Sequence, residues 1–124
     1  MVRKAIEEQH IGIVGLGYVG LPLAVEFAKH FQVIGFDISK SRVSSLLSGF
    51  DDSLEVRASD IKSSNQLKIT NNHNDLVKCN VFIITVPTPI DEFNKPDLTP
   101  LIKASETVGS LVKKDDIIIY ESTV

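Results

Sequence analysis

Hydrophobic residues recur along this chain with two different spacings. Short, nearly continuous apolar runs are typical of strands, whereas apolar residues three or four positions apart indicate helices. The short runs predict five strands, the last two of them buried, at residues 11–14, 32–36, 67–70, 81–86 and 116–120. Helical signals predict a helix that begins near residue 18 and further helices at residues 39–48, 58–65, 75–78 and 99–112.

A few residues set the helix boundaries in this interpretation. Pro22 lacks a backbone N–H and fits best in or just after a first helical turn, which places the helix start near Tyr18. Gly49 is expected to close the second helix. Thr99 followed by Pro100 is typical of an N-cap residue and the first helical position.

The alternation of strands and helices predicts the fold class. Strands that are apolar on both faces and alternate with helices form parallel sheets covered on each side. Because crossovers between parallel strands are right-handed, we expect an α/β fold, a Rossmann-type doubly wound sheet in the order 3-2-1-4-5. The 124 residues contain no internal repeat or linker and suffice for about one domain. Residues 1–124 are therefore expected to form a single Rossmann domain.

Composition and charge argue against several classes of partner. With 43% hydrophobic and 23% charged residues, the chain has the composition of an ordinary globular protein. A net charge of −3 argues against a nucleic-acid surface, which would need a basic stripe. No stretch approaches the ~20 apolar residues of a membrane span, and the N-terminus, MVRKAIEEQH, lacks the apolar core of a secretory signal. The single cysteine allows no internal disulfide. Together these features predict a cytoplasmic protein.

The sequence Gly-Leu-Gly-Tyr-Val-Gly at residues 15–20 follows the first predicted strand and opens the first predicted helix. Glycines in such a turn can be purely structural, but this context favours a dinucleotide-binding loop. In such a loop Gly15 makes the tight turn, Gly17 lets the backbone approach a pyrophosphate, and Gly20 lets the helix pack against the strand. The start of the helix then supplies free N–H groups and a partial positive charge for the phosphates.

An acidic residue, Asp37, stands at the end of the second predicted strand, 22 residues after Gly15. This matches the spacing of about 20 residues at which the acid that binds the adenosine ribose follows such a pattern. A carboxylate at this point accepts hydrogen bonds from both ribose hydroxyls of NAD but repels the 2′-phosphate of NADP. NAD is therefore the expected cofactor. The alternative is that Asp37 only caps the helix that begins near Ser39.

The sequence Val-Pro-Thr-Pro at residues 86–89 follows the fourth predicted strand. Two prolines around a threonine form a stiff loop at the carboxyl end of that strand, where doubly wound sheets bind their ligands. A stiff loop can hold a hydroxyl and backbone groups against a cofactor with little ordering cost. Taken alone, however, these residues are explained more simply by a turn that only ends the strand.

Several segments together resemble one enzyme family. GLGYVGLPLA, the acid-terminated second strand, VPTP and the closing STV occur in this order and spacing in the UDP-glucose/GDP-mannose dehydrogenase family. FIITVPTPID, KPDLTPLIKASETVG and YESTV resemble most its branch of UDP-N-acetylhexosamine 6-dehydrogenases, such as the enzymes of Vi polysaccharide biosynthesis. The resemblance covers essentially all 124 residues.

The resemblance implies an NAD-dependent enzyme that oxidises the C6 alcohol of a UDP-sugar to a uronate in two steps, with two NAD. The sugar would be a UDP-N-acetylhexosamine or UDP-glucose, and the full-length enzyme would be a homodimer or a larger oligomer. The family's catalytic cysteine and lysine lie downstream of the segments that match. The resemblance therefore implies that the chain is an N-terminal NAD-binding fragment of a longer enzyme and is inactive alone.

The family's motifs also assign roles to individual residues. Tyr18 and Val19 would contact the pyrophosphate through their backbone, Arg42 would lie beside the adenosine, and the Val-Pro-Thr of the stiff loop would line the nicotinamide side. Thr123 would be the catalytic residue, orienting a water or a substrate oxygen, with Ser122 beside it on the cofactor side. The expected cofactor-binding residues are Gly15, Leu16, Gly17, Tyr18, Val19, Gly20, Asp37, Arg42, Val86, Pro87, Thr88, Ser122 and Thr123.

The remaining candidate residues do not suggest a metal site. His10, His30 and His73 are scattered and have no clustered cysteine or carboxylate beside them. Cys79 precedes the fourth strand and therefore belongs to the edge of the sheet away from the cofactor. We expect it to be a buried structural thiol.

Two other classes of protein share part of the pattern. A β-hydroxyacid-type NAD dehydrogenase usually has methionine before the third glycine, where this chain has Val19, and lacks the VPTP loop. A non-catalytic nucleotide-sensing Rossmann module would use the same glycines and acid but would need neither VPTP nor STV.

Overall fold

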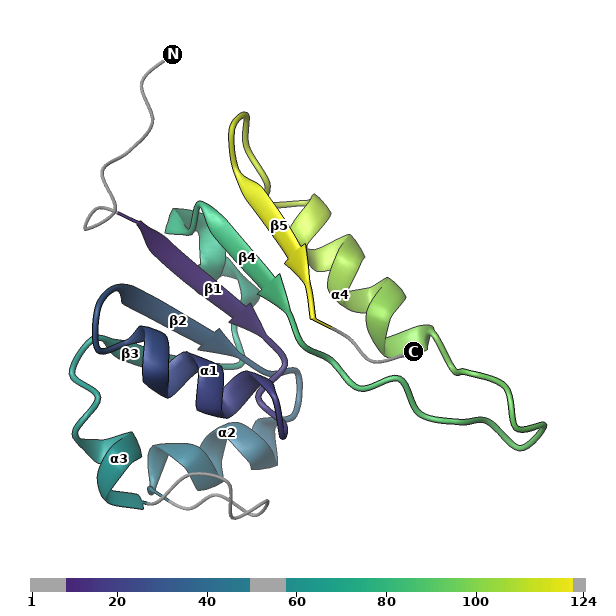
Figure 1. Ribbon diagram of the computed structural model, residues 1–124, viewed down its shortest axis with the longest axis horizontal. Helices are drawn as coiled ribbons and strands as arrows, with labels where there is room; N and C mark the ends of the chain where they lie inside the picture. The colour runs from purple at the N-terminus through teal and green to yellow at the C-terminus, as the bar shows by residue number, and fades with distance from the viewer. Residues whose placement is uncertain (1–8, 50–57, 122–124) are drawn as a thin grey trace.

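A computed structural model describes residues 9–49 and 58–121, and a parallel sheet of five strands forms the centre of this part of the chain (Figure 1). The strands are β1 (His10–Val14), β2 (Gln32–Phe36), β3 (Leu67–Thr70), β4 (Val81–Ile84) and β5 (Ile117–Tyr120). Their order is β3-β2-β1-β4-β5, and every neighbouring pair is parallel. The predicted 3-2-1-4-5 topology is therefore confirmed.

Helices cover both faces of the sheet, as in a doubly wound fold (Figure 1). The helical elements of the described residues are α1 (Gly20–Phe27), α2 (Lys40–Leu47), α3 (Ala58–Lys62), the 3₁₀ helix η2 (His73–Lys78) and α4 (Thr99–Gly109). The first three pack on one face, and η2 and α4 pack on the other. None of these helices is both long enough and apolar enough to cross a membrane.

A buried apolar cluster lies on each face of the sheet. Under α1, α2 and α3, the helices contribute side chains such as Leu21, Leu46 and Ile61, which pack against strand residues such as Ile13. On the other face, Phe82 is fully buried and packs within a cluster that includes residues of η2 and α4. Each fully buried side chain of this size contributes about 1.5–3 kcal/mol of transfer free energy, so both layers stabilise the fold.

The ends of α1 and α2 largely follow the sequence signals. α1 begins at Gly20, two residues later than expected, with Val19 as its N-cap residue. Ser39 caps α2, because its hydroxyl accepts a hydrogen bond of 3.2 Å from the backbone N–H of Arg42. Gly49 ends this helix with a φ of +88°, a conformation that glycine adopts without strain.

The prediction that Thr99 is the N-cap residue of α4 is wrong. Thr99 is already the first residue of the helix, and Leu98 occupies the N-cap position without a side-chain cap. The reason lies in Asp97, whose Oδ1 accepts a hydrogen bond of 3.0 Å from the Thr99 N–H. Hydrogen bonds from the hydroxyl and the N–H of Thr99 hold the pKa of Asp97 below its ordinary value. A carboxylate two residues before the helix thus binds the free N–H of its first residue.

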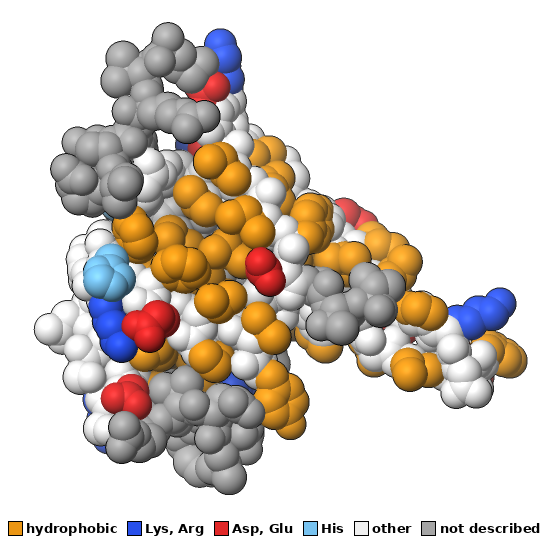
Figure 2. Space-filling view, in the orientation of Figure 1, with side chains coloured by type: hydrophobic (Ala, Val, Ile, Leu, Met, Phe, Trp, Pro, Cys, Tyr) orange, Lys and Arg blue, Asp and Glu red, His pale blue; other side chains and the backbone are white. Residues whose placement is uncertain are grey.

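The prediction that the last strand is buried is also wrong. The residues of β5 are 38% to 54% exposed. Among the described residues β5 pairs only with β4, and α4 runs beside it, linked by a contact of 2.9 Å between the hydroxyls of Ser105 and Tyr120. An edge strand of this kind keeps apolar surface open to water, and Figure 2 shows apolar side chains gathered across the middle of the face that carries α1.

The segment between β4 and α4 extends away from the sheet (Figure 1). Within it, Ile90 and Pro96 form an isolated antiparallel bridge. The Oδ1 atom of Asp91 accepts hydrogen bonds from the N–H groups of Phe93 (2.8 Å) and Lys95 (3.0 Å). Although the side chain of Phe93 is 72% exposed, the tip of the segment has a defined turn.

Candidate functional site

The carboxyl ends of three neighbouring strands meet at one edge of the sheet. The strand register pairs Val14 at the end of β1 with Phe36 of β2 and with Ile84 of β4. The glycine loop, residues 15–20, leaves β1 at this edge, and Asp37 follows β2 directly. Because the strand order reverses at β1, this edge is where a doubly wound sheet binds its ligand.

The first glycine of the loop is fixed by its backbone. The N–H of Gly15 donates to the Phe36 carbonyl (2.8 Å), and the N–H of Thr85 donates to the Val14 carbonyl (2.9 Å). Gly15 has a φ of +106°, which side chains other than glycine rarely adopt. A Cβ at Gly15 would lie 2.9 Å from the nitrogen of Val86. The loop backbone therefore packs directly against the chain that leaves β4.

The other two glycines of the loop meet different surroundings. A Cβ at Gly20 would overlap the carbonyl oxygen of Gly15 and would lie 2.5 Å from the hydroxyl oxygen of Thr85. The close packing of α1 therefore requires glycine at position 20. A Cβ at Gly17 would have no atom of the described residues, apart from its own chain neighbours, within 4 Å. The fold does not need glycine at position 17, whereas a pyrophosphate bound against this backbone would need it.

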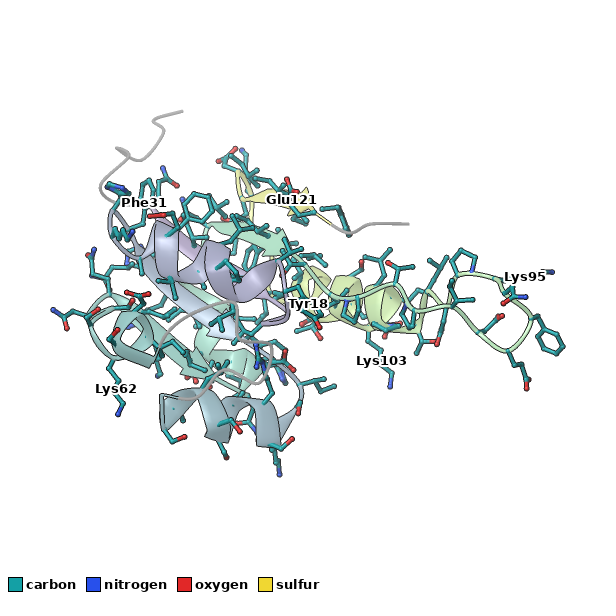
Figure 3. The ribbon with its side chains drawn as sticks, turned by 60° about the horizontal axis from the view of Figure 1, so that its bottom comes forward. Tyr18, Phe31, Lys62, Lys95, Lys103 and Glu121 are labelled. Atoms are coloured by element: carbon teal, nitrogen blue, oxygen red, sulfur yellow. The ribbon has the colours of Figure 1, made fainter. Side chains whose placement is uncertain are left out.

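Three N–H groups at the start of α1 are open to a ligand. Gly17, Tyr18 and Val19 are exposed, and their N–H groups donate to no acceptor in the described part of the chain. They immediately precede the first turn of α1, where the helix dipole is positive. Figure 3 shows Tyr18 at this end of α1, on the side from which the segment carrying Lys95 extends. This arrangement fits the binding of a pyrophosphate.

Asp37 joins the glycine loop to the start of α2. Its Oδ2 accepts a hydrogen bond from the N–H of Leu16 and its Oδ1 accepts one from the N–H of Ser39, both at 2.9 Å. An ionised carboxylate has about four acceptor positions, so these two bonds leave capacity for two ribose hydroxyls. Ser39 itself is the N-cap residue of α2, so Asp37 supports the start of that helix only through the N–H of Ser39.

Leu16 and Arg42 hold the loop in place. The side chain of Leu16 is fully buried, and its carbonyl oxygen accepts a hydrogen bond of 2.8 Å from Nε of Arg42. Since its N–H is bonded to Asp37, both backbone groups of Leu16 are engaged within the chain. The structure thus brings Leu16, Asp37 and Arg42 together. A direct contact of Leu16 or Arg42 with a cofactor stays a prediction.

The loop after β4 borders the glycine loop. Val86 and Thr88 are half-buried, and Pro87 is exposed. The hydroxyl oxygen of Thr88 is shielded from water and has no hydrogen-bond partner among the described residues. Such an unpaired buried group costs about 1–3 kcal/mol, so a polar group of a ligand would be stabilised there. The position of these three residues beside a nicotinamide stays a prediction.

Sequence reasoning did not single out Thr85, which lies between the two loops. This residue is 6% exposed, and its hydroxyl donates to the carbonyl oxygen of Gly15 at 2.6 Å. A threonine that follows four apolar strand residues is well explained by strand propensity alone. Only the closeness of the Gly15 carbonyl in the folded chain shows that its hydroxyl supports the glycine loop.

Ser122 and Thr123, which the resemblance places at the reaction centre, lie outside the described residues. The described chain reaches Glu121, whose N–H donates to the carbonyl of Ile84 at 2.9 Å. The end of β5 is therefore beside the end of β4, at the same edge as the glycine loop. The roles of Ser122 and Thr123 stay predictions.

Cys79 lies at the other edge of the sheet, just before β4 begins. Its side chain is fully buried, and burial raises the pKa of the thiol to about 12. Such a thiol is protonated at neutral pH and is a poor nucleophile. The expectation of a buried structural thiol is confirmed. In the described ranges, 9–49 and 58–121, no group of three or more His, Cys, Asp or Glu side chains is placed to hold a metal ion.

The fold and the site together define a dinucleotide-binding Rossmann domain. Such a domain needs parallel strands in doubly wound order, N–H groups at a helix start that have no acceptor in the described part of the chain, and a carboxylate after β2.

Comparison with known proteins then gives the family. Residues 9–124 match the NAD binding domain of the UDP-glucose/GDP-mannose dehydrogenase family, and the chain belongs to that family. Over 119 residues it is 58% identical to the UDP-N-acetyl-D-glucosamine 6-dehydrogenase of Pseudomonas aeruginosa and 54% identical to that of Salmonella typhi. Each match covers 96% of this chain and 28% of the relative.

A solved structure of a relative agrees with this assignment. The UDP-D-ManNAc dehydrogenase of Pyrococcus horikoshii matches with a TM-score of 0.82 and 36% identity, over 94% of this chain and 29% of that one. The family and the fold predicted from the sequence are therefore confirmed, as is NAD as the cofactor of the domain.

Proposed function

We propose that this chain is the NAD-binding part of a nucleotide-sugar 6-dehydrogenase, which oxidises the C6 alcohol of a UDP-sugar to a uronate with two NAD. The observation that carries the proposal is the 58% identity to a UDP-N-acetyl-D-glucosamine 6-dehydrogenase along nearly the whole chain. The chain spans 28% of the length of that relative. We assign the sugar site and the catalytic cysteine and lysine to a longer protein whose N-terminal domain is residues 1–124.

The residues of this chain bind and orient the cofactor in the proposed reaction. The N–H groups of Gly17, Tyr18 and Val19 hold the pyrophosphate, Asp37 accepts hydrogen bonds from the adenosine ribose, and the loop after β4 borders the nicotinamide. Bound NAD supplies the acceptor for one hydride in each of the two oxidation steps, and water supplies the second carboxylate oxygen. Thr123 orients the water or the substrate oxygen.

The charge of Asp37 selects the cofactor in this proposal. Its carboxylate is fixed by two backbone N–H groups and is partly exposed. A 2′-phosphate placed beside it would bring two like charges together, which is unfavourable, whereas two ribose hydroxyls complete its hydrogen bonds. The proposal therefore includes a preference for NAD over NADP.

The proposal also includes a substrate and a setting for the full-length enzyme. We propose UDP-N-acetylhexosamine or UDP-glucose as the sugar nucleotide, bacterial polysaccharide biosynthesis as the pathway class, and the cytoplasm as the location. The full-length enzyme is proposed to be a homodimer or a larger oligomer that binds neither nucleic acid nor membranes.

The absorbance of NADH tests this function. The 124-residue chain mixed with NAD and UDP-N-acetylglucosamine or UDP-glucose should produce no NADH. The protein encoded by the full reading frame should produce two NADH per sugar oxidised. A full-length protein that binds NAD but forms no NADH with either UDP-sugar would contradict the proposal and would favour a non-catalytic sensing module.

A further inference from the structure

Thr85 connects the two loops that border the site, and we propose that its hydroxyl positions the glycine loop for binding of the pyrophosphate. This inference rests on the proposed NAD site. The Oγ1 atom of Thr85 lies 2.6 Å from the carbonyl oxygen of Gly15, to which it donates, and 3.3 Å from that of Val14. Because Thr85 is nearly fully buried, water does not compete for this hydrogen bond.

With the Thr85 hydroxyl, both backbone polar groups of Gly15 are hydrogen-bonded. The N–H of Gly15 donates to the carbonyl of Phe36, and its carbonyl accepts from Thr85. The backbone of Gly15 is thus fixed by the end of β2 and by the residue that follows β4, in the left-handed conformation that starts the turn. Since the open N–H groups of residues 17–19 follow within the same turn, their direction depends on how firmly Gly15 is held.

The same hydroxyl also fills the space between the first and the third glycine of the loop. A Cβ at Gly20 would lie only 2.5 Å from Oγ1 of Thr85, so the start of α1 packs directly against the hydroxyl. Thr85 also directly precedes Val86, whose nitrogen packs against Gly15. One side chain therefore sets the position of the glycine loop, the start of α1 and the loop after β4 relative to one another. Thr85 is a positioning residue in this account, because its hydroxyl acts through Gly15.

Two variants isolate the hydroxyl. Thr85→Ser keeps the hydroxyl and loses the methyl group, whereas Thr85→Ala loses both, so the two variants differ only in the hydroxyl. Calorimetric titration of each folded variant with NAD and with ADP-ribose gives the dissociation constants. We expect Thr85→Ala to bind both ligands about tenfold more weakly than wild type, and Thr85→Ser to stay within about threefold of it.

Adenosine separates positioning from a general loss of structure. It carries the ribose but no pyrophosphate, so its dissociation constant, measured by NMR titration, should differ between Thr85→Ala and Thr85→Ser by much less than that of NAD does. Equal NAD affinities for the two variants would overturn the inference. A loss of adenosine affinity in Thr85→Ala as large as its loss of NAD affinity would also overturn it. If the wild-type chain does not bind NAD, the proposed function fails and this inference fails with it. If the wild-type chain binds NAD and the two variants bind it with equal affinity, the inference is overturned and the proposed function stands.

A measurement on the wild-type chain covers the case in which Thr85→Ala does not fold. The Thr85 hydroxyl proton should exchange slowly with water and should show a nuclear Overhauser contact to the α-protons of Gly20. A hydroxyl proton that exchanges as fast as that of an exposed threonine would overturn the inference without any variant.

Discussion

Oδ2 of Asp37 lies 2.9 Å from the backbone nitrogen of Leu16 and accepts its hydrogen bond. The residue that is predicted to bind the adenosine ribose is therefore also attached to the loop that is predicted to bind the pyrophosphate. The two halves of the proposed adenosine diphosphate site share one carboxylate. Changes at Asp37 should consequently affect binding through both the ribose and the loop.

Replacing Asp37 tests this coupling. Asp37→Ala should weaken NAD binding by at least about 1.5–3 kcal/mol, the worth of hydrogen bonds to a charged group. Asp37→Asn keeps one acceptor oxygen but loses the charge. It should therefore weaken NAD binding less than Asp37→Ala does, and it should narrow the difference in affinity between NAD and NADP. Calorimetric titration of all three proteins measures these affinities. Equal NAD affinity in wild type and Asp37→Ala would exclude the ribose role.

Gly17 separates binding from stability. Because a Cβ at this position meets no atom of the described residues beyond its chain neighbours within 4 Å, Gly17→Ala should leave the free energy of unfolding within about 0.5 kcal/mol of wild type. The same methyl group would occupy the space proposed for the pyrophosphate, so NAD binding should weaken at least about tenfold, or 1.4 kcal/mol. Urea unfolding and NAD titration of one preparation give both quantities. A variant that binds NAD like wild type would place the pyrophosphate elsewhere.

Gly20 should behave in the opposite way. A Cβ there overlaps the Gly15 carbonyl oxygen, so Gly20→Ala should destabilise the fold by at least about 1–3 kcal/mol, the usual cost of overpacking. Gly109 is a matched control, since it is also a helical glycine, but outside its own helix backbone a Cβ on it meets no atom of the described residues within 4 Å. Gly109→Ala should stabilise the fold by up to about 1 kcal/mol. Urea unfolding compares the two, and similar stabilities would show that α1 is not packed as described.

Cys79 makes stability depend on pH in the alkaline range. The pKa of its thiol is about 12 in the folded chain and has an ordinary value of 9.0. Above pH 9 the unfolded chain therefore binds fewer protons than the folded chain, and stability falls as pH rises, by at most about 1.4 kcal/mol per pH unit. Urea unfolding from pH 8 to 10 measures this slope.

The control for this prediction is Cys79→Ala. This variant should be less stable overall because it leaves a cavity, but it should lose the part of the slope that depends on the thiol. A slope between pH 8 and 10 that is identical with and without the thiol would show that Cys79 is not buried as the structure places it.

Local patterns were sufficient to predict most of the sheet. The strands Gln32–Phe36 and Leu67–Thr70 have the predicted bounds, because an apolar run is visible within the strand itself. The sheet order is the predicted one, because right-handed crossovers are a general property of parallel sheets. The exposure of Ile117–Tyr120 could not be predicted in this way. An apolar run is the same in sequence whether a strand is central or, like β5, lies at an edge with little packed against it.

The site was predictable only in part. The glycines and Asp37 were found because their spacing along the chain reflects the geometry of the turn and the ribose. The hydrogen bond from Thr85 to Gly15 joins residues separated by 70 positions, and no local pattern indicates it. The same holds for the bond from Arg42 to the carbonyl of Leu16, which depends on how α2 returns to the edge of the sheet.

The measurement that tests the central claim most directly is an NMR titration of the 124-residue chain with NAD, followed through the backbone amide signals. The account predicts saturable shifts that cluster at residues 15–20, at Asp37 and at residues 85–88, together with little change around Cys79 at the other edge of the sheet. Absence of saturable shifts, or shifts that cluster around Cys79 or the α3 surface instead, would contradict it.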